Sequence, residues 1–282
     1  MSNVIHFARP AQPGPVARLA SHIACFGRHR RIEEDVFWLK ENAELLNILE
    51  CTRYSGAATA PEDLAPYQAF FDGIKARMGF FPQYYRFLLS ICLDLEDLGL
   101  AGNRGEALCA WVDRAGLPEA ELSDLQRAEA RRLLARRDID ALPDDRGLTG
   151  RLHAFIDRSA TFALPNKKAA YELTHIVFYL SEYGRRDPGL SRAAVDSLHF
   201  AGLVAWLEQN ADLLAETCIA LRYAGEAPPE RWEAWLDRVQ STYRAGEPGT
   251  GDAYHAYFVG AWRQRMTGGR GFHLDLSSGA VW

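Results

Sequence analysis

Hydrophobic residues recur along the chain at the three- and four-residue spacing of amphipathic helices, in segments divided by proline and glycine. Alternating β-branched runs closed by Asn-Gly or Asp-Gly, which indicate strands, are almost absent from the sequence. The pattern therefore predicts a series of helices, at about 14–27, 31–52, 61–77, 82–97, 104–114, 118–136, 147–161, 167–184, 189–209, 211–224, 229–245 and 252–266.

The segment ends have the chemistry expected of helix ends. Pro61 is suited to a first helical turn, and Asp187 is expected to cap the helix near residue 189. Gly184 and Gly225 are expected to end two others. Because most connections are short, successive helices should pack antiparallel as hairpins. We therefore expect an all-α protein with about twelve antiparallel helices, either an α/α toroid or an irregular helical bundle.

The chain of 282 residues is predicted to be a single all-helical domain with one continuous core, and the acidic loop 137–147 is the candidate point for a subdivision. The tail 267–282 is too rich in glycine for a stable helix. It is also too apolar to be free, so we expect it to dock on the body, either as a stabilising arm or across a cavity mouth. Its apolar residues are Phe272, Leu274, Leu276, Val281 and Trp282.

Composition excludes several classes of function. A net charge of −5 argues against general affinity for nucleic acid, which requires an excess of basic residues. The five cysteines form no CxxC pair, and we expect five reduced thiols in a cytoplasmic protein. Neither a secretory signal nor a membrane-spanning run is evident, which predicts no membrane partner.

The segment "YELTHIVFYLSEYG", Tyr171 to Gly184, carries titratable groups in an apolar context. At helical spacing, Glu172, His175, Tyr179 and Glu182 fall on one face, apart from an aliphatic face. Burial of such groups is costly unless they pair with each other, with a metal or with water. The stripe should therefore face a polar interior feature or solvent.

Two further segments repeat the acidic-x-x-His spacing of Glu172 and His175. Asp196 precedes His199, and Asp252 precedes His255. With 8 histidines and 37 acidic residues in 282 positions, chance gives about one such pair (8 × 37/282). Bundle enzymes with carboxylate-bound metals use this spacing to aim two ligands inward.

These residues define a candidate site in the C-terminal half. The metal ligands would be His175, His255 and the carboxylate of Glu172, with His199 as a further candidate. Nitrogen and oxygen donors without thiolate suit one divalent metal ion, Zn, Fe or Mn. Glu182 and Tyr179 would be catalytic, supporting the ligands or transferring protons.

Each residue also has a structural interpretation. An inward histidine is often a hydrogen-bonded core residue, and Asp252 is suited to an N-cap. Asp196 can face solvent, and Glu182 can form a surface ion pair with Arg185 or Arg186. The acidic residues Asp94, Glu96 and Asp97 are best interpreted as a helix end, and Lys40, Glu41 and Glu44 as ordinary surface pairs.

The blocks "YELTHIVFYLSEYG" and "DAYHAYFVGAW", residues 171–184 and 252–262, resemble the signature regions of an uncharacterised family of bacterial all-helical proteins. Some of these are associated with peptide natural-product biosynthesis. The resemblance implies that His175 and His255 matter, and it brings no established reaction.

We expect a metal-dependent or acid–base enzyme that acts on a small molecule or modified peptide. The alternative is a non-catalytic helical scaffold or binding module whose inward histidines are core residues. A carbohydrate-active toroid using two carboxylates would draw on the 7 Trp and 11 Tyr, although such barrels usually need a longer chain.

Overall fold

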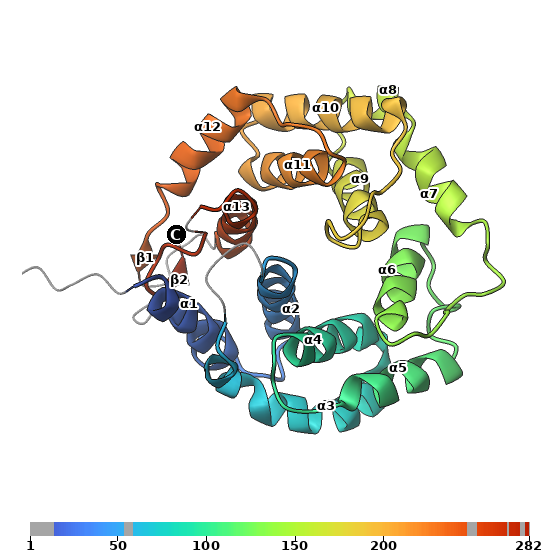
Figure 1. The fold of residues 1–282 in the computed structure, drawn as a ribbon, viewed down its shortest axis with the longest axis vertical. Coiled ribbons are helices and arrows are strands. Elements are labelled where there is room, and N and C mark those ends of the chain that lie inside the picture. The colour runs from blue at the N-terminus through green and yellow to red at the C-terminus, as the bar shows by residue number, and fades with distance from the viewer. Residues whose placement is uncertain (1–13, 54–58, 247–252, 270, 277–279, 282) are drawn as a thin grey trace, which may run out of the picture.

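Successive helices alternate between two concentric rings (Figure 1). The computed structural model describes residues 14–53, 59–246, 253–269, 271–276 and 280–281. Within this part of the chain, the outer ring contains α1 (Pro15–Ala24), α3 (Gln68–Phe80), α5 (Arg104–Arg114), α7 (Leu148–Ile156), α8 (Ser159–Phe162), α10 (Arg192–Leu207) and α12 (Glu230–Gln240). The inner ring contains α2 (Val36–Cys51), α4 (Tyr85–Asp97), α6 (Asp124–Ala135), α9 (Lys167–Leu180), α11 (Ala211–Tyr223) and α13 (Tyr254–Met266).

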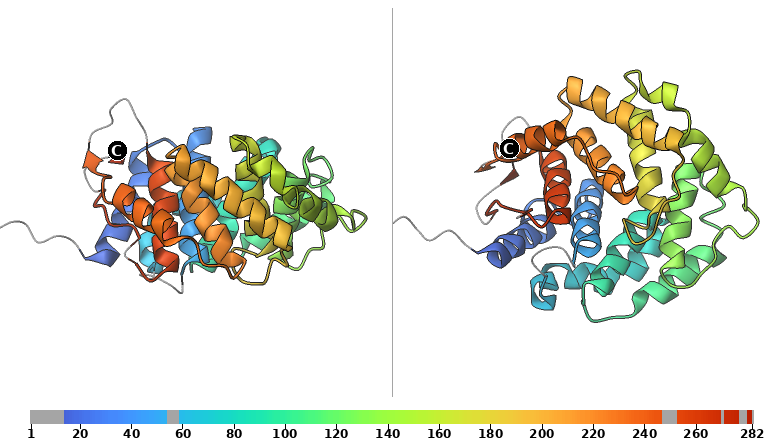
Figure 2. Two further views of the ribbon diagram at one scale, coloured as in Figure 1. Left: turned by 90° about the horizontal axis from the view of Figure 1, so that it is seen from above. Right: turned by 45° about the horizontal axis from the view of Figure 1, so that its top comes forward.

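The inner ring is closed. Each inner helix contacts the next one, and α13, the last, contacts α2, the first. Seen from above, the two rings form a flat disc (Figure 2). The predicted α/α toroid of antiparallel hairpins is therefore the observed architecture, and the ring continues across the 137–147 loop through contacts between α6 and both α7 and α9.

Polar side chains at the helix starts fix several of the predicted boundaries. Asp35, Ser123, Asn166 and Asn210 accept hydrogen bonds from the backbone N–H groups of the first turns of α2, α6, α9 and α11. The expected cap at Asp187 is wrong. Ser191 caps α10 instead, whereas Asp187 stabilises a turn by accepting a hydrogen bond from the Gly189 N–H at 2.8 Å.

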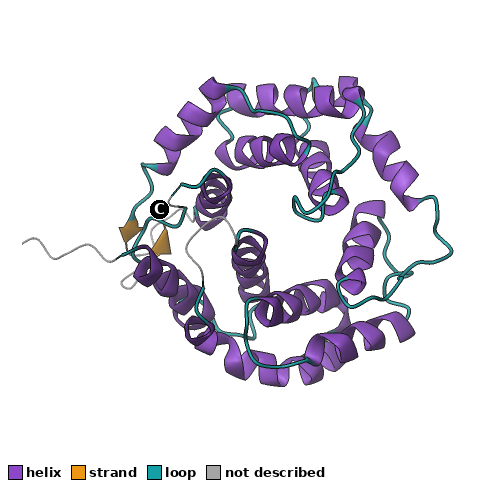
Figure 3. Cartoon of the chain, in the orientation of Figure 1, coloured by secondary structure: helices purple, strands orange, loops and turns teal. Residues whose placement is uncertain are grey.

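Some predicted helices are interrupted or change type, and proline begins two of the segments concerned. The first continues as a π-helix, Cys25–His29, and two others begin with the 3₁₀ segments Pro61–Tyr67 and Pro82–Tyr84. The helix predicted at 147–161 is divided into α7 and α8. Among the described residues, the strands are the two-residue β1 (Ala245–Gly246) and β2 (Ala280–Val281), which pair antiparallel (Figure 3).

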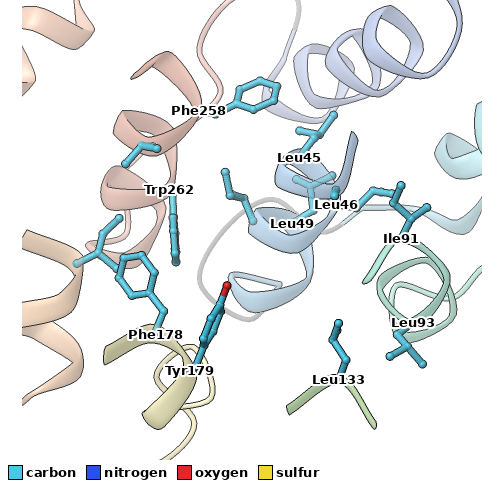
Figure 4. Close-up of a cluster of buried hydrophobic side chains, with 14 of the residues drawn as sticks. Leu45, Leu46, Leu49, Ile91, Leu93, Leu133, Phe178, Tyr179, Phe258 and Trp262 are labelled. Carbon is cyan, nitrogen blue, oxygen red and sulfur yellow. The ribbon is translucent and has the colours of Figure 1, made fainter. Parts of the chain in front are cut away.

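Apolar side chains of the inner helices pack together in the hydrophobic core (Figure 4). Leu45 and Leu49 of α2 lie near Phe258 and Trp262 of α13, and the rings of Phe178 and Trp262 are 4.9 Å apart. Each such buried side chain contributes about 1.5–3 kcal/mol by leaving water. This packing holds α2, α9 and α13 in fixed positions.

The described part of the tail docks on the body, as predicted. Phe272, Leu274 and Leu276 are buried, and the Leu274 N–H donates to the Tyr257 hydroxyl at 3.2 Å. The Leu276 N–H donates to Ser21 Oγ on α1 at 3.0 Å. Trp282, which the sequence also placed in this contact, lies outside the described residues.

The five cysteines are free thiols, as expected from their spacing. Among the helices of the described ranges, none is both long enough and apolar enough to span a membrane.

Candidate functional site

His255, on the inner helix α13, lies between carboxylates of its two neighbouring inner helices. Its Nδ1 is 2.9 Å from Glu44 Oε2 on α2. Its Nε2 is 3.6 Å from Asp212 Oδ2 and 4.0 Å from Glu216 Oε1, both on α11. The imidazole is therefore surrounded by three carboxylates.

These carboxylates determine the proton content of His255. Burial lowers the pKa of the imidazole, but the hydrogen bond to Glu44 and the charges of Glu44, Glu216 and Asp212 outweigh burial and raise the pKa to about 9. His255 is consequently an imidazolium at neutral pH, with a proton available at Nε2.

His175, on α9, has a backbone carbonyl as the partner of its Nδ1, in place of the carboxylate that binds His255. Its Nδ1 is 2.8 Å from the Tyr171 carbonyl oxygen. Because a carbonyl only accepts hydrogen bonds, Nδ1 carries the proton and the lone pair of the neutral ring is at Nε2. The side chains of His175 and His255 are 36% and 35% exposed, although both belong to the inner ring. Solvent therefore reaches both imidazoles.

Glu216 connects the two histidines. Its side chain is 3% exposed, and its Oε2 accepts a hydrogen bond from the Thr174 hydroxyl at 2.6 Å. The same oxygen is 3.8 Å from His175 Nδ1. Burial raises the pKa of the Glu216 carboxyl, while His175, the Thr174 hydrogen bond and His255 act in the opposite direction. The pKa of Glu216 is raised overall, with burial as the largest cause.

Tyr171 extends this network. Its hydroxyl donates to Asp212 Oδ2 at 2.6 Å, and burial together with this hydrogen bond raises the pKa of the phenol above its ordinary value. We call the resulting group of side chains the His–carboxylate cluster, which consists of Glu44, Tyr171, His175, Asp212, Glu216 and His255.

Helical geometry explains how the cluster forms. Tyr171 and His175, like Asp212 and Glu216, are four residues apart and therefore occupy one face of their helix. The N-caps Asn166 and Asn210 fix the start of α9 and of α11. Since α9, α11, α13 and α2 are successive neighbours in the closed inner ring, these faces meet only in the folded toroid.

The structure does not bring His199 to the other two predicted histidines. His199 lies on the outer helix α10, where its ring is 6.4 Å from that of Trp232 on α12. Its neighbour Asp196 pairs with Arg192 at 3.0 Å. An apolar helix face predicts that a side chain points into the protein. For a helix of the outer ring, this direction leads to the layer between the two rings.

Glu172 is half-buried on α9 one residue from Tyr171, and among the described residues it forms no hydrogen bond or ion pair. Asp252 lies outside the described residues, so its predicted N-cap role stays a prediction.

Tyr179 and Glu182 lie further along the stripe. The Tyr179 ring is 6.1 Å from that of His175, and the Arg132 guanidinium is 5.9 Å from the Tyr179 ring centroid. Glu182 follows the end of α9 and is 3.6 Å from both Arg132 and Arg186. The predicted ion pair with Arg186 is therefore confirmed, whereas Arg185 pairs with Glu50 instead.

Sequence reasoning missed four members of the cluster, Glu44, Tyr171, Asp212 and Glu216. The available signal was the Asp-x-x-x-Glu spacing in the otherwise apolar segment "ADLLAETCIALRY". Glu44 does face Lys40 at 3.9 Å, as predicted, but it also binds His255.

The interpretation of Glu41 as an ordinary surface pair is wrong. Glu41 is buried and accepts hydrogen bonds from Arg30 and Arg31. These arginines belong to a segment that precedes α2, so the helical periodicity of α2 did not reveal them.

The acidic helix end Asp94, Glu96 and Asp97 is neutralised by guanidinium groups, in agreement with its predicted structural role. Arg136 donates to Asp94 and Asp97, each at 2.7 Å, and Arg137 donates to Glu96 at 2.8 Å. The C-terminal end of α4 is consequently part of an ion-pair network.

In the described ranges, no group of three or more His, Cys, Asp or Glu side chains is arranged to hold a metal ion. The ligand roles of His175, His255, His199 and Glu172 stay predictions.

No curated protein and no solved structure matches the chain. A protein-family model described as "Domain of unknown function (DUF6902)" matches residues 1–282, the whole sequence. The toroid with its His–carboxylate cluster therefore belongs to this DUF6902 family.

Proposed function

We propose that the protein is an acid–base enzyme that acts on a small molecule or a modified peptide at the His–carboxylate cluster. One observation carries the proposal. Two solvent-accessible imidazoles, His175 on α9 and His255 on α13, flank the buried carboxylate of Glu216 on α11, and Nδ1 of one faces a carbonyl whereas Nδ1 of the other faces a carboxylate. Imidazoles within reach of both solvent and a buried carboxylate are typical of acid–base catalysis.

The geometry suggests a role for each group. His175 would accept a proton at Nε2, because its Nδ1 is engaged by the Tyr171 carbonyl. His255, with its pKa raised to about 9, would donate a proton or stabilise developing negative charge. Glu216 lies within 4.0 Å of a nitrogen of each ring and would compensate for the charge that moves between them.

Two features support the proposed substrate class and cellular compartment. Residues 171–184 and 252–262 resemble an uncharacterised family of bacterial all-helical proteins, some of them associated with peptide natural-product biosynthesis, which supports a modified peptide as substrate. The five free cysteines support a reducing compartment such as the cytoplasm.

The test is an untargeted conversion assay. The purified full-length chain is incubated with a pool of bacterial metabolites and small peptides, and the consumed and formed masses are recorded by liquid chromatography–mass spectrometry. A His175→Ala, His255→Ala double variant is compared with His199→Ala, a matched control that removes an outer-ring imidazole. We expect conversions that the parent and the control perform and the double variant loses.

Circular dichroism and thermal unfolding must show that the double variant is folded. If a folded double variant converts the same compounds as the parent, or if the parent converts none, the enzyme proposal is wrong and a helical binding module is favoured. In that case both histidines are polar core residues.

The metal-dependent form of the proposal has a separate test. Imidazole and carboxylate donors on neighbouring helices are the ligand types that zinc, iron and manganese use. Elemental analysis of protein purified without a metal-affinity tag, before and after reconstitution, measures bound metal. Near-stoichiometric metal that is lost in the folded double variant would favour metal-assisted chemistry over acid–base catalysis by the side chains alone.

A further inference from the structure

A concave region lies between the inner helices α6 and α9 and the outer helix α7. Its volume is about 540 Å³, within the range of small-molecule pockets. Three arginines, Arg131, Arg132 and Arg186, line it together with Tyr179 and Glu182. We call it the arginine cleft. It is distinct from the His–carboxylate cluster, whose members lie on α2, α9, α11 and α13.

Arg132 is the central group of the arginine cleft. The residue is 6% exposed, yet its Nε is buried without a hydrogen-bond partner among the described residues. Its nearest carboxylate oxygen, Oε2 of Glu182, is 3.6 Å from Nη1, longer than a hydrogen bond. Its guanidinium otherwise faces the rings of Tyr179 and Tyr183. A buried guanidinium has five N–H donors to satisfy, so Arg132 retains unused binding capacity.

Arg131 and Arg186 add donors nearer to solvent. Arg131 donates to the Thr149 hydroxyl at 2.8 Å, a neutral partner. Arg186 donates to the Leu180 carbonyl at 2.8 Å, and its Nη2 is 3.6 Å from Glu182 Oε1. Glu182 is thus the carboxylate that faces two of the three guanidinium groups, and neither contact is a hydrogen bond.

We propose that the arginine cleft binds the oxyanion group, a phosphate or a carboxylate, of a small ligand. Planar guanidinium groups match both oxyanions through paired N–H donors. The exposed carboxylates of Asp140 and Asp187 also line the cleft, but Asp187 is engaged by the Gly189 N–H. The oxyanion would be bound by Arg131, which is nearer to solvent, and by the buried Arg132.

Glu182 acts as an internal competitor for this ligand. It lies in a turn in which Glu182, Tyr183 and Gly184 all have positive φ, at 49°, 53° and 84°. Non-glycine residues adopt this conformation rarely, and it places the Glu182 carboxylate between Arg132 and Arg186. A bound oxyanion would replace that carboxylate as the partner of both arginines.

The arginine cleft adjoins the candidate active site. Tyr179 lines the cleft, and its ring is 6.1 Å from the His175 ring one helical turn away. A ligand anchored by an oxyanion in the cleft would therefore extend toward the His–carboxylate cluster. The assignment of the cleft itself does not depend on the acid–base proposal.

The test is isothermal titration calorimetry of the full-length chain at low ionic strength, with inorganic phosphate and, separately, glutarate as probes. Saturable binding of one probe identifies the type of oxyanion. Arg131→Ala and Arg132→Lys should each weaken that binding by about tenfold or more, since a charge-assisted hydrogen bond of about 1.5 kcal/mol or more is lost. Arg192→Ala removes an exposed arginine on α10 that also pairs with one carboxylate, and it should leave binding unchanged.

Glu182→Gln provides the opposite change. Because it removes the competing charge and keeps the side-chain size, it should tighten binding severalfold. The proposal is overturned if neither probe binds saturably, if Arg192→Ala weakens binding as much as Arg131→Ala, or if Glu182→Gln weakens it. Thermal unfolding of each variant separates loss of binding from loss of fold, and Arg131→Ala, at a half-buried position, keeps the test valid if Arg132→Lys is unstable.

Discussion

Asp94 and Glu216 are both buried carboxylates on inner helices, but their partners differ in kind. Asp94 is 0% exposed and accepts a 2.7 Å hydrogen bond from Arg136 and a 3.1 Å hydrogen bond from Ser90. Glu216 is equally inaccessible, but it has a threonine hydroxyl and two imidazoles, each about a third exposed, as partners.

The type of partner indicates whether a buried carboxylate has a structural or a functional role. A guanidinium does not lose its proton in a protein, so the pair of Asp94 and Arg136 is a fixed charge arrangement. An imidazole, in contrast, can exchange its proton, so the charge around Glu216 can change. A buried carboxylate that faces solvent-accessible histidines is therefore the better indicator of a site than burial alone.

Removal of Arg136 should have the largest effect on the free energy of unfolding. Arg136→Leu leaves Asp94 buried without its cation and also removes a partner of Asp97. We expect a loss of about 3–5 kcal/mol, measured by denaturant unfolding. The double variant Arg136→Leu, Asp94→Asn should recover part of this loss. If Arg136→Leu costs less than about 1 kcal/mol, which is typical of a surface pair, the network is not the fixed structural element described above.

The two carboxylates should respond differently when each is made neutral. Asp94→Asn removes a charge-assisted hydrogen bond and should cost about 1.5–3 kcal/mol of unfolding free energy. Glu216→Gln keeps a hydrogen-bond acceptor for Thr174 and relieves the burial of a charge, so its cost should stay below about 1 kcal/mol. Equal losses of stability in parallel denaturant titrations would mean that both carboxylates are structural.

The pH dependence of His255 sharpens the comparison further. Its folded pKa, about 9, lies above the ordinary value of 6.5. The unfolded chain therefore binds fewer protons than the folded one between these values, so this stabilising contribution is fully present below pH 6.5 and is lost as pH rises toward 9. Glu44→Gln should lower the pKa of His255 by about one unit or more and flatten this decline in stability.

Two-dimensional NMR of the imidazole resonances measures the pKa of His255 directly. Glu172→Gln, a change of the same type on α9 at a residue that does not contact His255 in the described structure, is the control. An unchanged pKa of His255 in Glu44→Gln would refute the role assigned to Glu44.

Periodicity was enough to predict most of the fold but only part of the site. The helix faces at His175 and His255 were visible in the sequence, because burial on a helix follows a local repeat. Glu216, Asp212 and Glu44 join these histidines through ring closure, a contact between residues far apart in the chain. The charge pattern of one helix has no signal for such neighbours.

His199 shows that the sequence pattern also selected a residue that the fold places away from the cluster. Its acidic-x-x-His spacing and apolar face match those of His175, but its helix belongs to the outer ring. In a toroid, inward-facing residues of alternate helices enter different layers, and the sequence does not state which helices alternate. The ring membership of each helix had to come from the structure.

The smallest expected effect is that of His199→Gln, which tests whether ring membership decides function. The side chain is half-buried near Trp232, and no described hydrogen bond or ion pair joins it to the His–carboxylate cluster, so its replacement should change the free energy of unfolding by less than about 1 kcal/mol. The pKa of His255, followed by NMR, should not move, and the reactions detected in the conversion assay should persist. A shifted pKa of His255 in this variant would show that the two rings are coupled, and the separation between structural and functional histidines drawn from the alternation of helices would fail.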